Sequence, residues 1–388
     1  MYIPAWQGLS PRYLLRNRAH GTPPFPLDRS RSIYFYRASS ALYHLFRALR
    51  LEEGQTALVP DYHSGNEVWA LRAAGVPVRF YPVRRTMQPD LEALERLCTP
   101  DVRVLLVIHY LGWPQPMQAI TALCRKRRLI LVEDCALSLL SQDGGRPLGT
   151  FGDHAVFCLY KTLPLPNGAL LAQNTDRLPE LAALDLQACA MRSVAGRSME
   201  LMLGWLRSRS ELTGRSLFTI KRVAARALDA LSIRRHPLGD IGFDLSNVNI
   251  GMSPLCHALL KRFDYRQIVR VRRRNYTLLA SLLEGKVALA QPELPEGVCP
   301  LFLPILVPDK RAAAETLWRQ GIEAVQFWNE GDPEASADPS TDAMFLRRHV
   351  LELPIHHEVA ASQIEYIAER VLAQRRLFAF ENAAETAA

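Results

Sequence analysis

Short apolar runs alternate with amphipathic stretches along the first half of the chain. In residues 39–50, leucines and a phenylalanine recur at helical spacing after a pair of serines, which predicts a helix with a serine N-cap. Further helical patterns separate most of the apolar runs that read as strands, which are TALVP, VPVRFYPV, VRVLLVIHYLG, RLILVED and HAVFCLY. This alternation predicts an α/β fold with a parallel sheet covered by helices on both faces.

The second half of the chain has a different pattern. From Pro179 to about Ile241 it is basic and helical, and one long helix is predicted over residues 254–283. The C-terminal part reads as strand, helix, strand and helix, with IEAVQFW as the second strand, which predicts a small α+β domain. We therefore expect an N-terminal arm (1–30), a large domain (31–178), a basic helical insert (179–241) and a small C-terminal domain (242–388).

Composition is that of an ordinary globular protein, with 388 residues, 48% of them apolar and 22% charged. The N-terminus lacks the continuous apolar core of a signal peptide, and no apolar stretch is long enough for a membrane span, which predicts a cytoplasmic protein. The seven cysteines form no C-x-x-C pair and the ten histidines no H-E-x-x-H spacing. We therefore expect neither a disulfide scaffold nor a metal site.

The positive charge is local. Between residues 190 and 236, ten Arg or Lys face three acidic residues, so this segment carries +7 of the net charge of +8. Three interpretations stay open: a solvated or dimer-packing helical pair, which is favoured, a clamp for an anionic carrier, or a peripheral contact with an anionic membrane. Nucleic-acid binding is not expected, because no DNA- or RNA-binding motif accompanies the charge.

A lysine and an aspartate are predicted at the same edge of the sheet. Lys161 follows HAVFCLY, and Asp134 ends RLILVED, so both lie beyond carboxyl ends of strands, where ligands of such sheets bind. A lysine amine can attack carbonyl groups, and its best-known use is a Schiff base with pyridoxal phosphate (PLP). The pyridine nitrogen of that cofactor stays protonated beside a carboxylate. At ~4 Å such a pair is worth about 4 kcal/mol at a dielectric constant near 20.

The same cofactor needs an anion site and an aromatic neighbour. The predicted helix start ASSALYHL offers amides and the hydroxyls of Ser39 and Ser40 to a phosphate, and PDYHSGN offers the rings of Tyr62 and His63. Each feature also has an ordinary interpretation as a cap, a core residue or a solvated lysine. Their order along a parallel α/β pattern favours the cofactor.

These motifs together resemble the DegT-type nucleotide-sugar aminotransferases, PLP enzymes of the aspartate aminotransferase fold (fold type I). The resemblance runs from about Ser39 to Val371, without the basic insert. It is carried by the following stretches: ASSALYHLF, VPDYH, AAGVPVRFYPV, VIHYLGWPQPMQAI, LILVEDCALS, GGRPLGTFGDHAVFCLYKTL and NVNIGMSPLCHALL. It implies that PLP is the cofactor and that the fold has a large sheet domain and a small α+β domain.

Residue roles follow from the resemblance. Lys161 would form the Schiff base and shuttle the proton, and Asp134 would hold the ring nitrogen. Ser39 and Ser40 would hold the phosphate, with Cys158 near the position of a family serine. Asn249 would reach the phosphate from a second subunit, which implies a homodimer.

Several positions depart from the family pattern. Leu137 replaces a glutamine that touches the cofactor, Gly251 replaces an arginine, and Ser64 stands where the stacking aromatic residue normally lies, so stacking would fall to Tyr62 or His63. The loop before Lys161 is two residues shorter. A dehydratase branch of the family replaces the lysine with histidine, and Lys161 argues against that branch.

The sequence therefore predicts a two-stage transamination. An amino-acid donor, glutamate as the first candidate, would load the cofactor, and a keto sugar, nucleotide-linked, would take the amino group. Two alternatives stay open: a PLP-fold binding or scaffold protein that has lost its chemistry, for which Leu137 and the shortened loop are the best evidence, and an aminotransferase of a non-sugar carbonyl substrate.

Overall fold

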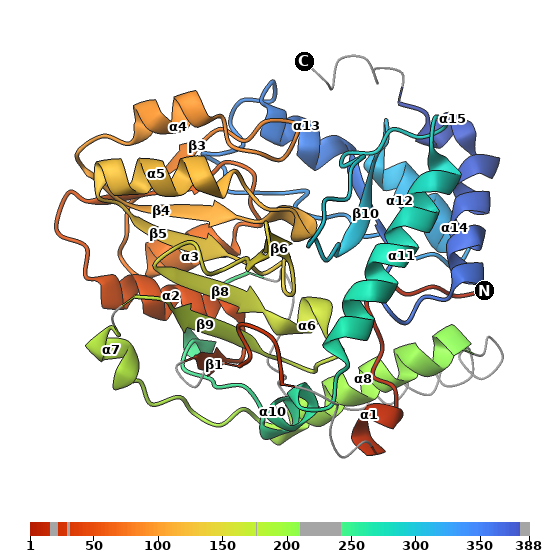
Figure 1. Ribbon diagram of the computed structural model, residues 1–388, viewed down its shortest axis with the longest axis horizontal. Coiled ribbons are helices and arrows are strands. Elements are labelled where there is room, and N and C mark those ends of the chain that lie inside the picture. The colour runs from red at the N-terminus through yellow and green to blue at the C-terminus, as the bar shows by residue number, and fades with distance from the viewer. Residues whose placement is uncertain (16–21, 29–31, 176, 210–241, 381–388) are drawn as a thin grey trace.

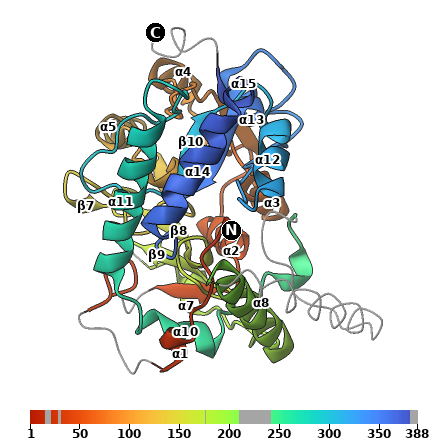
Figure 2. The ribbon, with the colours of Figure 1, turned by 90° about the vertical axis from the view of Figure 1, so that its right-hand side faces the viewer.

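The computed structural model describes residues 1–15, 22–28, 32–175, 177–209 and 242–380 (Figure 1). A large sheet with helices on both faces occupies one half of the molecule, and a smaller α+β unit with the long helix α11 occupies the other (Figure 1). Figure 2 shows α11 and α14 side by side on the outside of this second unit. Among the described residues, no helix is long and apolar enough to cross a membrane.

The large sheet has seven strands in the order β1-β9-β8-β5-β4-β2-β3. Five neighbouring strands run parallel to one another, namely β8, β5, β4, β2 and β3. At the other side of the sheet, β9 is antiparallel to β8 and β1 is antiparallel to β9. The sheet is therefore mainly parallel. The strands are β1 (Ile33–Phe35), β2 (Thr56–Pro60), β3 (Val78–Tyr81), β4 (Val102–Ile108), β5 (Ile130–Asp134), β8 (His154–Cys158) and β9 (Ala169–Gln173).

Both faces of this sheet are buried, as its unbroken apolar strands require. In β4, Val104 and Leu106 point into one hydrophobic cluster and Leu105 and Val107 into another, which is the two-residue period of a strand. The first cluster includes α2 (Ala38–Leu49) and α3 (Asn66–Ala73), and the second includes α4 (Leu91–Leu97) and α5 (Met117–Arg127). The predicted layers are confirmed.

The smaller sheet pairs β10 (Phe302–Leu306) with β11 (Val350–Pro354) in antiparallel register. The prediction that IEAVQFW is a strand is wrong, because only two isolated bridges form there, from Ile322 to Ile3 and from Val325 to Glu352. The second strand is β11, which follows a helix that the sequence analysis missed. The surrounding helices are α12 (Lys310–Arg319), α13 (Asp342–His349), α14 (Ala361–Ala373) and α15 (Arg375–Phe378).

The predicted long helix over residues 254–283 is two helices, α10 (Pro254–Leu260) and α11 (Tyr265–Leu283). Asp264 separates them, since its side chain accepts a hydrogen bond from the backbone of Gln267 and starts α11 as an N-cap. The residues of α10 pack with Phe157 and Leu170 in a third hydrophobic cluster, so this helix lies against the large sheet.

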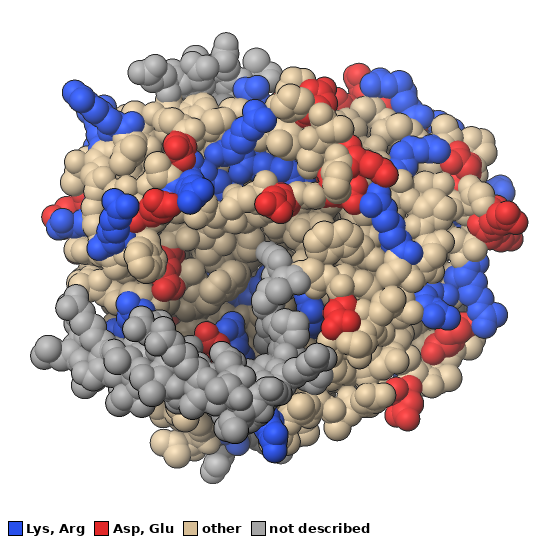
Figure 3. All heavy atoms as spheres, turned by 180° about the vertical axis from the view of Figure 1, so that it is seen from behind, with Lys and Arg blue, Asp and Glu red and all other residues tan. Residues whose placement is uncertain are grey.

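The remaining elements are short except α8 (Met191–Arg209), the described part of the basic insert. The rest of that insert, from residue 210 to 241, lies outside the described residues. On the face seen in Figure 3, basic and acidic side chains are interspersed over the described surface. The short elements are α1 (Arg12–Leu15), β6 (Gln142–Asp143), β7 (Arg146–Pro147), α6 (Leu159–Thr162), α7 (Pro179–Ala182) and the 3-10 turns Tyr110–Gly112 and Leu245–Asn247.

Candidate active site

Lys161 and Asp134 line one pocket at the carboxyl edge of the large sheet. They meet there because β5 and β8 are parallel neighbours, with Asp134 of β5 opposite Val156 of β8. The cavity volume of this pocket is about 40 Å³. Its lining residues are Arg37, Ala38, Ser39, Leu42, Ser64, Asn66, Glu67, Asp134, Ala136, Cys158, Tyr160 and Lys161.

Lys161 lies in the single helical turn α6, directly after β8. This turn ends before the prolines that follow it. Gln7 of the N-terminal arm donates from Nε2 to the main-chain oxygens of Tyr160 and Lys161, at 3.3 Å each. The Lys161 ammonium lies 5.5 Å from the centre of the Phe327 ring, which is within the range of a cation–π contact.

A buried arginine braces the same turn. Arg272 of α11 donates to the main-chain oxygen of Thr162 at 3.2 Å and to Gln7 Oε1 at 3.1 Å. It also donates to the main-chain oxygens of Pro300 and Leu301. Burial lowers the pKa of Arg272 to about 10. This one side chain therefore connects the N-terminal arm, the lysine turn and the smaller unit.

Glu133, the residue before Asp134, ties the end of β5 to two neighbouring segments. The Glu133 carboxylate accepts the backbone N–H groups of Gly149 at 2.8 Å and Gly152 at 2.6 Å. It also contacts His109 Nε2 at 3.0 Å, while His109 Nδ1 accepts the N–H of Gln115 and so leaves the proton on Nε2. Three of the quoted motifs, VIHYLGW, LILVED and GTFGD, thus meet at one buried carboxylate.

The carboxyl group of Asp134 lies in an environment that disfavours its charge. Burial, and secondly the negative charge of Glu67, raise its pKa to about 7, against the opposing effects of the Ala136 N–H and Lys161. The Ala136 N–H donates to Asp134 Oδ1 at 2.8 Å. A positive group beside Asp134 would favour the ionised form and remove part of the cost of burying it.

The first turn of α2 faces the pocket, as predicted, but its cap is different. The N-cap residue is Arg37, whose side chain makes no capping hydrogen bond, and the two serines lie inside the helix. The expected serine N-cap is therefore wrong. Ser39 lines the pocket, whereas Ser40 is buried behind it. A twelve-residue helix with an uncapped first turn offers backbone N–H groups to an anion.

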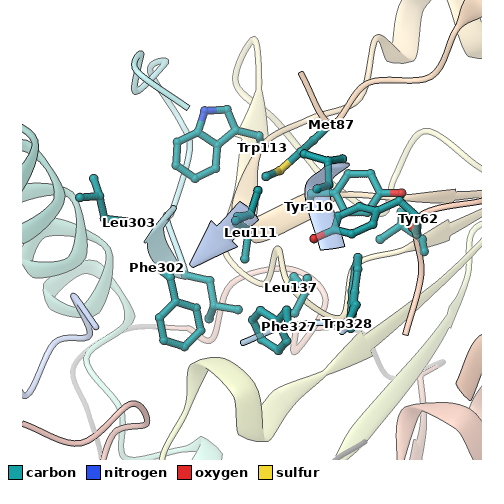
Figure 4. Close-up of a cluster of buried hydrophobic side chains, with 14 of the residues drawn as sticks. Tyr62, Met87, Tyr110, Leu111, Trp113, Leu137, Phe302, Leu303, Phe327 and Trp328 are labelled. Atoms are coloured by element: carbon teal, nitrogen blue, oxygen red, sulfur yellow. Dashed lines mark hydrogen bonds between the residues drawn. The ribbon is translucent and has the colours of Figure 1, made fainter. Parts of the chain in front are cut away.

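The rings proposed for stacking point elsewhere. Tyr62 is buried against Tyr110 and Trp328, with ring centres 5.3 and 4.9 Å away (Figure 4). His63 stacks on Phe80, and burial lowers its pKa to about 3. Neither is among the residues that line the pocket, and Ser64 lines it instead.

Of the other predicted positions, only one lies in the pocket. Cys158 lines the pocket and is buried, at the end of β8. Leu137 lies in the apolar cluster with Phe327 and Trp328, which explains why an apolar residue fits there (Figure 4). Asn249 does not line the pocket of its own chain and lies beside His44 of α2.

Eight of the twelve pocket residues were not predicted as site residues: Arg37, Ala38, Leu42, Ser64, Asn66, Glu67, Ala136 and Tyr160. Glu67 had a visible signal, because Ser64 and Glu67 have the S-x-x-E spacing of a capping box. The Ser64 N–H and hydroxyl both donate to the Glu67 carboxylate. Phe327, whose ring lies near the Lys161 ammonium, had no such signal in the sequence. It comes from the segment IEAVQFW, which was wrongly predicted to be a strand.

One cluster has the composition of a metal site. The ligand atoms of His109, Glu133 and Cys135 lie within 4.8 Å of one another, and all three side chains are buried. The hydrogen bonds of Glu133 and His109 already given account for this arrangement without an ion. We assign it a structural role.

Comparison with known proteins agrees with this architecture. Residues 28–205 match the model of the DegT/DnrJ/EryC1/StrS aminotransferase family, which confirms the resemblance drawn from the motifs. A dTDP-4-dehydro-2,3,6-trideoxy-D-glucose 4-aminotransferase of Saccharopolyspora spinosa is 30% identical over 39% of this chain and 40% of the relative. A GDP-perosamine synthase of Escherichia coli O157:H7 is 29% identical over 36% of this chain and 39% of the relative. The matched stretch thus spans about two fifths of these relatives.

The fold matches solved structures over nearly the whole chain. The aminotransferase PseC of Helicobacter pylori, involved in the biosynthesis of pseudoaminic acid, has a TM-score of 0.71 at 15% identity and covers 96% of this chain and 98% of its own. The sugar aminotransferase CalS13 of Micromonospora echinospora has a TM-score of 0.66 at 18% identity, with 96% and 100% covered. The predicted fold class, fold type I with a mainly parallel sheet, is confirmed.

Proposed function

We propose that this protein is a PLP-dependent aminotransferase that transfers an amino group from an amino acid to a keto sugar. The observation that carries the proposal is the pocket itself, in which a lysine amine, a buried carboxylate and an uncapped helix N-terminus face the same space. These are the three groups that PLP requires: an amine for its carbonyl, an anion for its ring nitrogen and amides for its phosphate.

The residues present fit the cofactor on independent grounds. Asp134 is a buried carboxyl group with a raised pKa, and a protonated ring nitrogen would supply its missing counter-charge. The first turn of α2 has no side-chain cap, and a phosphate would accept its N–H groups. Ser39 adds a hydroxyl, and Arg37 adds a positive charge at the same end of the pocket.

The cofactor would supply an electron sink for the carbon from which the proton is removed. Lys161 would hold the cofactor and then move that proton as base and acid, and its turn is fixed by Gln7 and Arg272 for this purpose. Phe327 shields the amine from water on one side. Asp134 would keep the ring nitrogen charged.

The substrates are proposed from the names of relatives. The relatives given above include aminotransferases named for a dTDP-linked keto sugar and for GDP-perosamine. Further relatives of Micromonospora echinospora and Streptoalloteichus tenebrarius are named as glutamine-dependent aminotransferases of inososes, which are cyclic ketones. We propose a nucleotide-linked keto sugar as acceptor and glutamate or glutamine as donor, and a cytoplasmic location follows from such substrates.

A homodimer completes this proposal. Asn249 is absent from the pocket lining of its own chain, so its predicted contact with the phosphate requires a second copy. The described part of the basic insert favours packing over a membrane contact, because three of its four arginines have local partners. Arg197 pairs with Glu200, Arg209 with Glu358, and Arg207 lies over the Tyr2 ring.

The alternative is a binding protein of the same fold without transfer chemistry. Leu137 and the lack of an aromatic residue at Ser64 favour it, whereas the intact Lys161 and Asp134 pair favours the enzyme.

Single-turnover experiments separate the two. Purified protein loaded with PLP would be mixed with glutamate or glutamine, and conversion to the amino form of the cofactor followed by absorbance. Conversion, followed by amination of one member of a panel of dTDP-, GDP- and UDP-linked keto sugars in mass spectrometry, supports the proposal. If the protein binds PLP but no amino-acid donor converts the cofactor, the protein is the binding protein of the alternative.

A further inference from the structure

A second cavity lies away from the catalytic pocket, beside α11. It has an accessible volume of about 480 Å³ and shares no lining residue with the catalytic pocket. Its walls come from the N-terminal arm, the loop and hairpin around β6 and β7, and α11, and Figures 1 and 2 both show the hairpin next to this helix. We call it the α11 cavity. Its size is that of a site for a small organic ligand.

All charged residues that line the α11 cavity are basic. Three arginines line it, Arg266, Arg270 and Arg273, and no acidic residue does. The whole of α11 contains five arginines and no acid. The sequence analysis missed this concentration because it assigned the charge to residues 190–236.

The five arginines of α11 have different surroundings. Arg272 points inward to the lysine turn, and Arg273 donates to the main-chain oxygens of Pro295 and Val298. Among the described residues, Arg266 and Arg270 have no acidic partner. They are four residues apart, so their side chains leave the same face of the helix with an axial spacing of about 6 Å.

The opposite wall is apolar. Phe25, Leu140 and Leu148 line it, and Val269 lies between the two arginines on α11. The Phe25 ring is fixed by an edge contact with Phe157, with ring centres 5.9 Å apart. A ligand that fills this space needs an apolar body and an anionic group at the α11 end.

We propose that the α11 cavity binds an organic phosphate with an aromatic or apolar body, whose phosphate lies between Arg266 and Arg270. A phosphate fits better than a carboxylate, because its three oxygens and double charge can accept N–H groups from two guanidinium groups at once. The body packs against Phe25, Leu148 and Val269. Nucleotides and prenyl phosphates both have this chemistry, and the experiment distinguishes them.

The test uses the full chain and 1-naphthyl phosphate, a fluorescent aromatic phosphate, in equilibrium titrations. The double variant Arg266→Gln/Arg270→Gln removes both charges, and Val269→Trp fills the cavity without touching a charge. Arg311→Gln is the control, since Arg311 is an exposed arginine of α12 outside both pockets. Thermal unfolding of each variant shows that it folds.

The expected result is saturable binding to wild type and Arg311→Gln, at least tenfold weaker binding to the double variant, and loss of binding in Val269→Trp. Inorganic phosphate should compete only weakly, because it lacks the body. Displacement by UDP identifies a nucleotide, and displacement by geranyl phosphate but not UDP identifies a prenyl phosphate. No saturable binding to wild type, equal binding to the double variant, or displacement by neither compound overturns the proposal.

Discussion

Gln7 holds the backbone of Lys161, although 154 positions separate them in the sequence. Its Nε2 donates to the oxygens of Tyr160 and Lys161 while its Oε1 accepts from the buried Arg272. The N-terminal arm is therefore part of the support of the proposed catalytic lysine. Gln7 itself does not line the pocket, so removing its side chain should displace that lysine without replacing any lining residue.

Gln7→Ala leaves buried polar groups without partners, each of which costs about 1–3 kcal/mol. We expect PLP to bind about tenfold more weakly, which corresponds to ~1.4 kcal/mol. Titration of the cofactor by absorbance measures this, with Gln118→Ala, an exposed glutamine of α5, as the control. Unchanged affinity in Gln7→Ala would show that the arm does not support the lysine.

Arg347 joins the loop after β2 to the smaller unit. It donates to the main-chain oxygens of Asp61 and His63 on one side and of Trp328 and Glu330 on the other. Arg347→Met should lower the free energy of unfolding by about 2–4 kcal/mol, since several buried carbonyl groups lose their donor. Denaturant unfolding measures the loss.

The same variant should also loosen the loop that carries Ser64 and Glu67. Faster amide hydrogen exchange in residues 61–67, with the exchange of β5 unchanged, is the expected pattern. A uniform increase over the whole chain would mean that Arg347 contributes to global stability only.

Asp134 should make the cofactor-free protein less stable as the pH rises. Its pKa is about 7 in the folded protein against an ordinary value of 3.8, so the folded state binds the proton more tightly. The stabilisation by the protonated form is complete below pH 3.8 and is lost as the pH rises toward about 7. Asp134→Asn keeps an oxygen for the Ala136 N–H and has no charge to bury.

We therefore expect Asp134→Asn to be more stable than wild type at pH 7 without cofactor. The difference should grow by at most about 1.4 kcal/mol per pH unit above pH 3.8. Unfolding at a series of pH values measures it. The variant should also lose affinity for PLP, and a variant with equal affinity would remove Asp134 from the site.

Glu67 contributes to the raised pKa of Asp134 through its negative charge. Glu67→Gln removes that charge and keeps a side-chain oxygen that can accept from the N–H and hydroxyl of Ser64. The difference in stability between wild type and Asp134→Asn should still begin near pH 3.8, but the pH at which it stops growing should move below about 7 when both carry Glu67→Gln. No movement would show that the Glu67 charge does not reach Asp134.

The sequence predicted the sheet layers and the family resemblance because these depend on local patterns. Alternating apolar strands identified both faces of β4, and the motifs around Asp134 and Lys161 placed them at one edge. What it could not predict depends on contacts between distant segments. Gln7, Arg272 and Phe327 support the lysine turn from three separate parts of the chain, and no local pattern marks them.

Local patterns also led to wrong predictions for the stacking residues and for one helix. Aromatic residues next to a strand suggested stacking, but Tyr62 and His63 turn into apolar clusters, and Ser64 faces the pocket. The helical pattern over residues 254–283 suggested one helix, but the Asp264 N-cap divides it. In both cases one side-chain direction or one hydrogen bond decided the outcome.

The central claim is that Lys161 holds PLP in the pocket that contains Asp134. Borohydride reduction of the PLP-loaded protein, followed by peptide mapping in a mass spectrometer, tests it most directly. The account predicts a single modified peptide, with the cofactor mass on Lys161, and none in Lys161→Ala. Modification of another lysine with Lys161 unmodified, or no modification at saturating PLP, would contradict it.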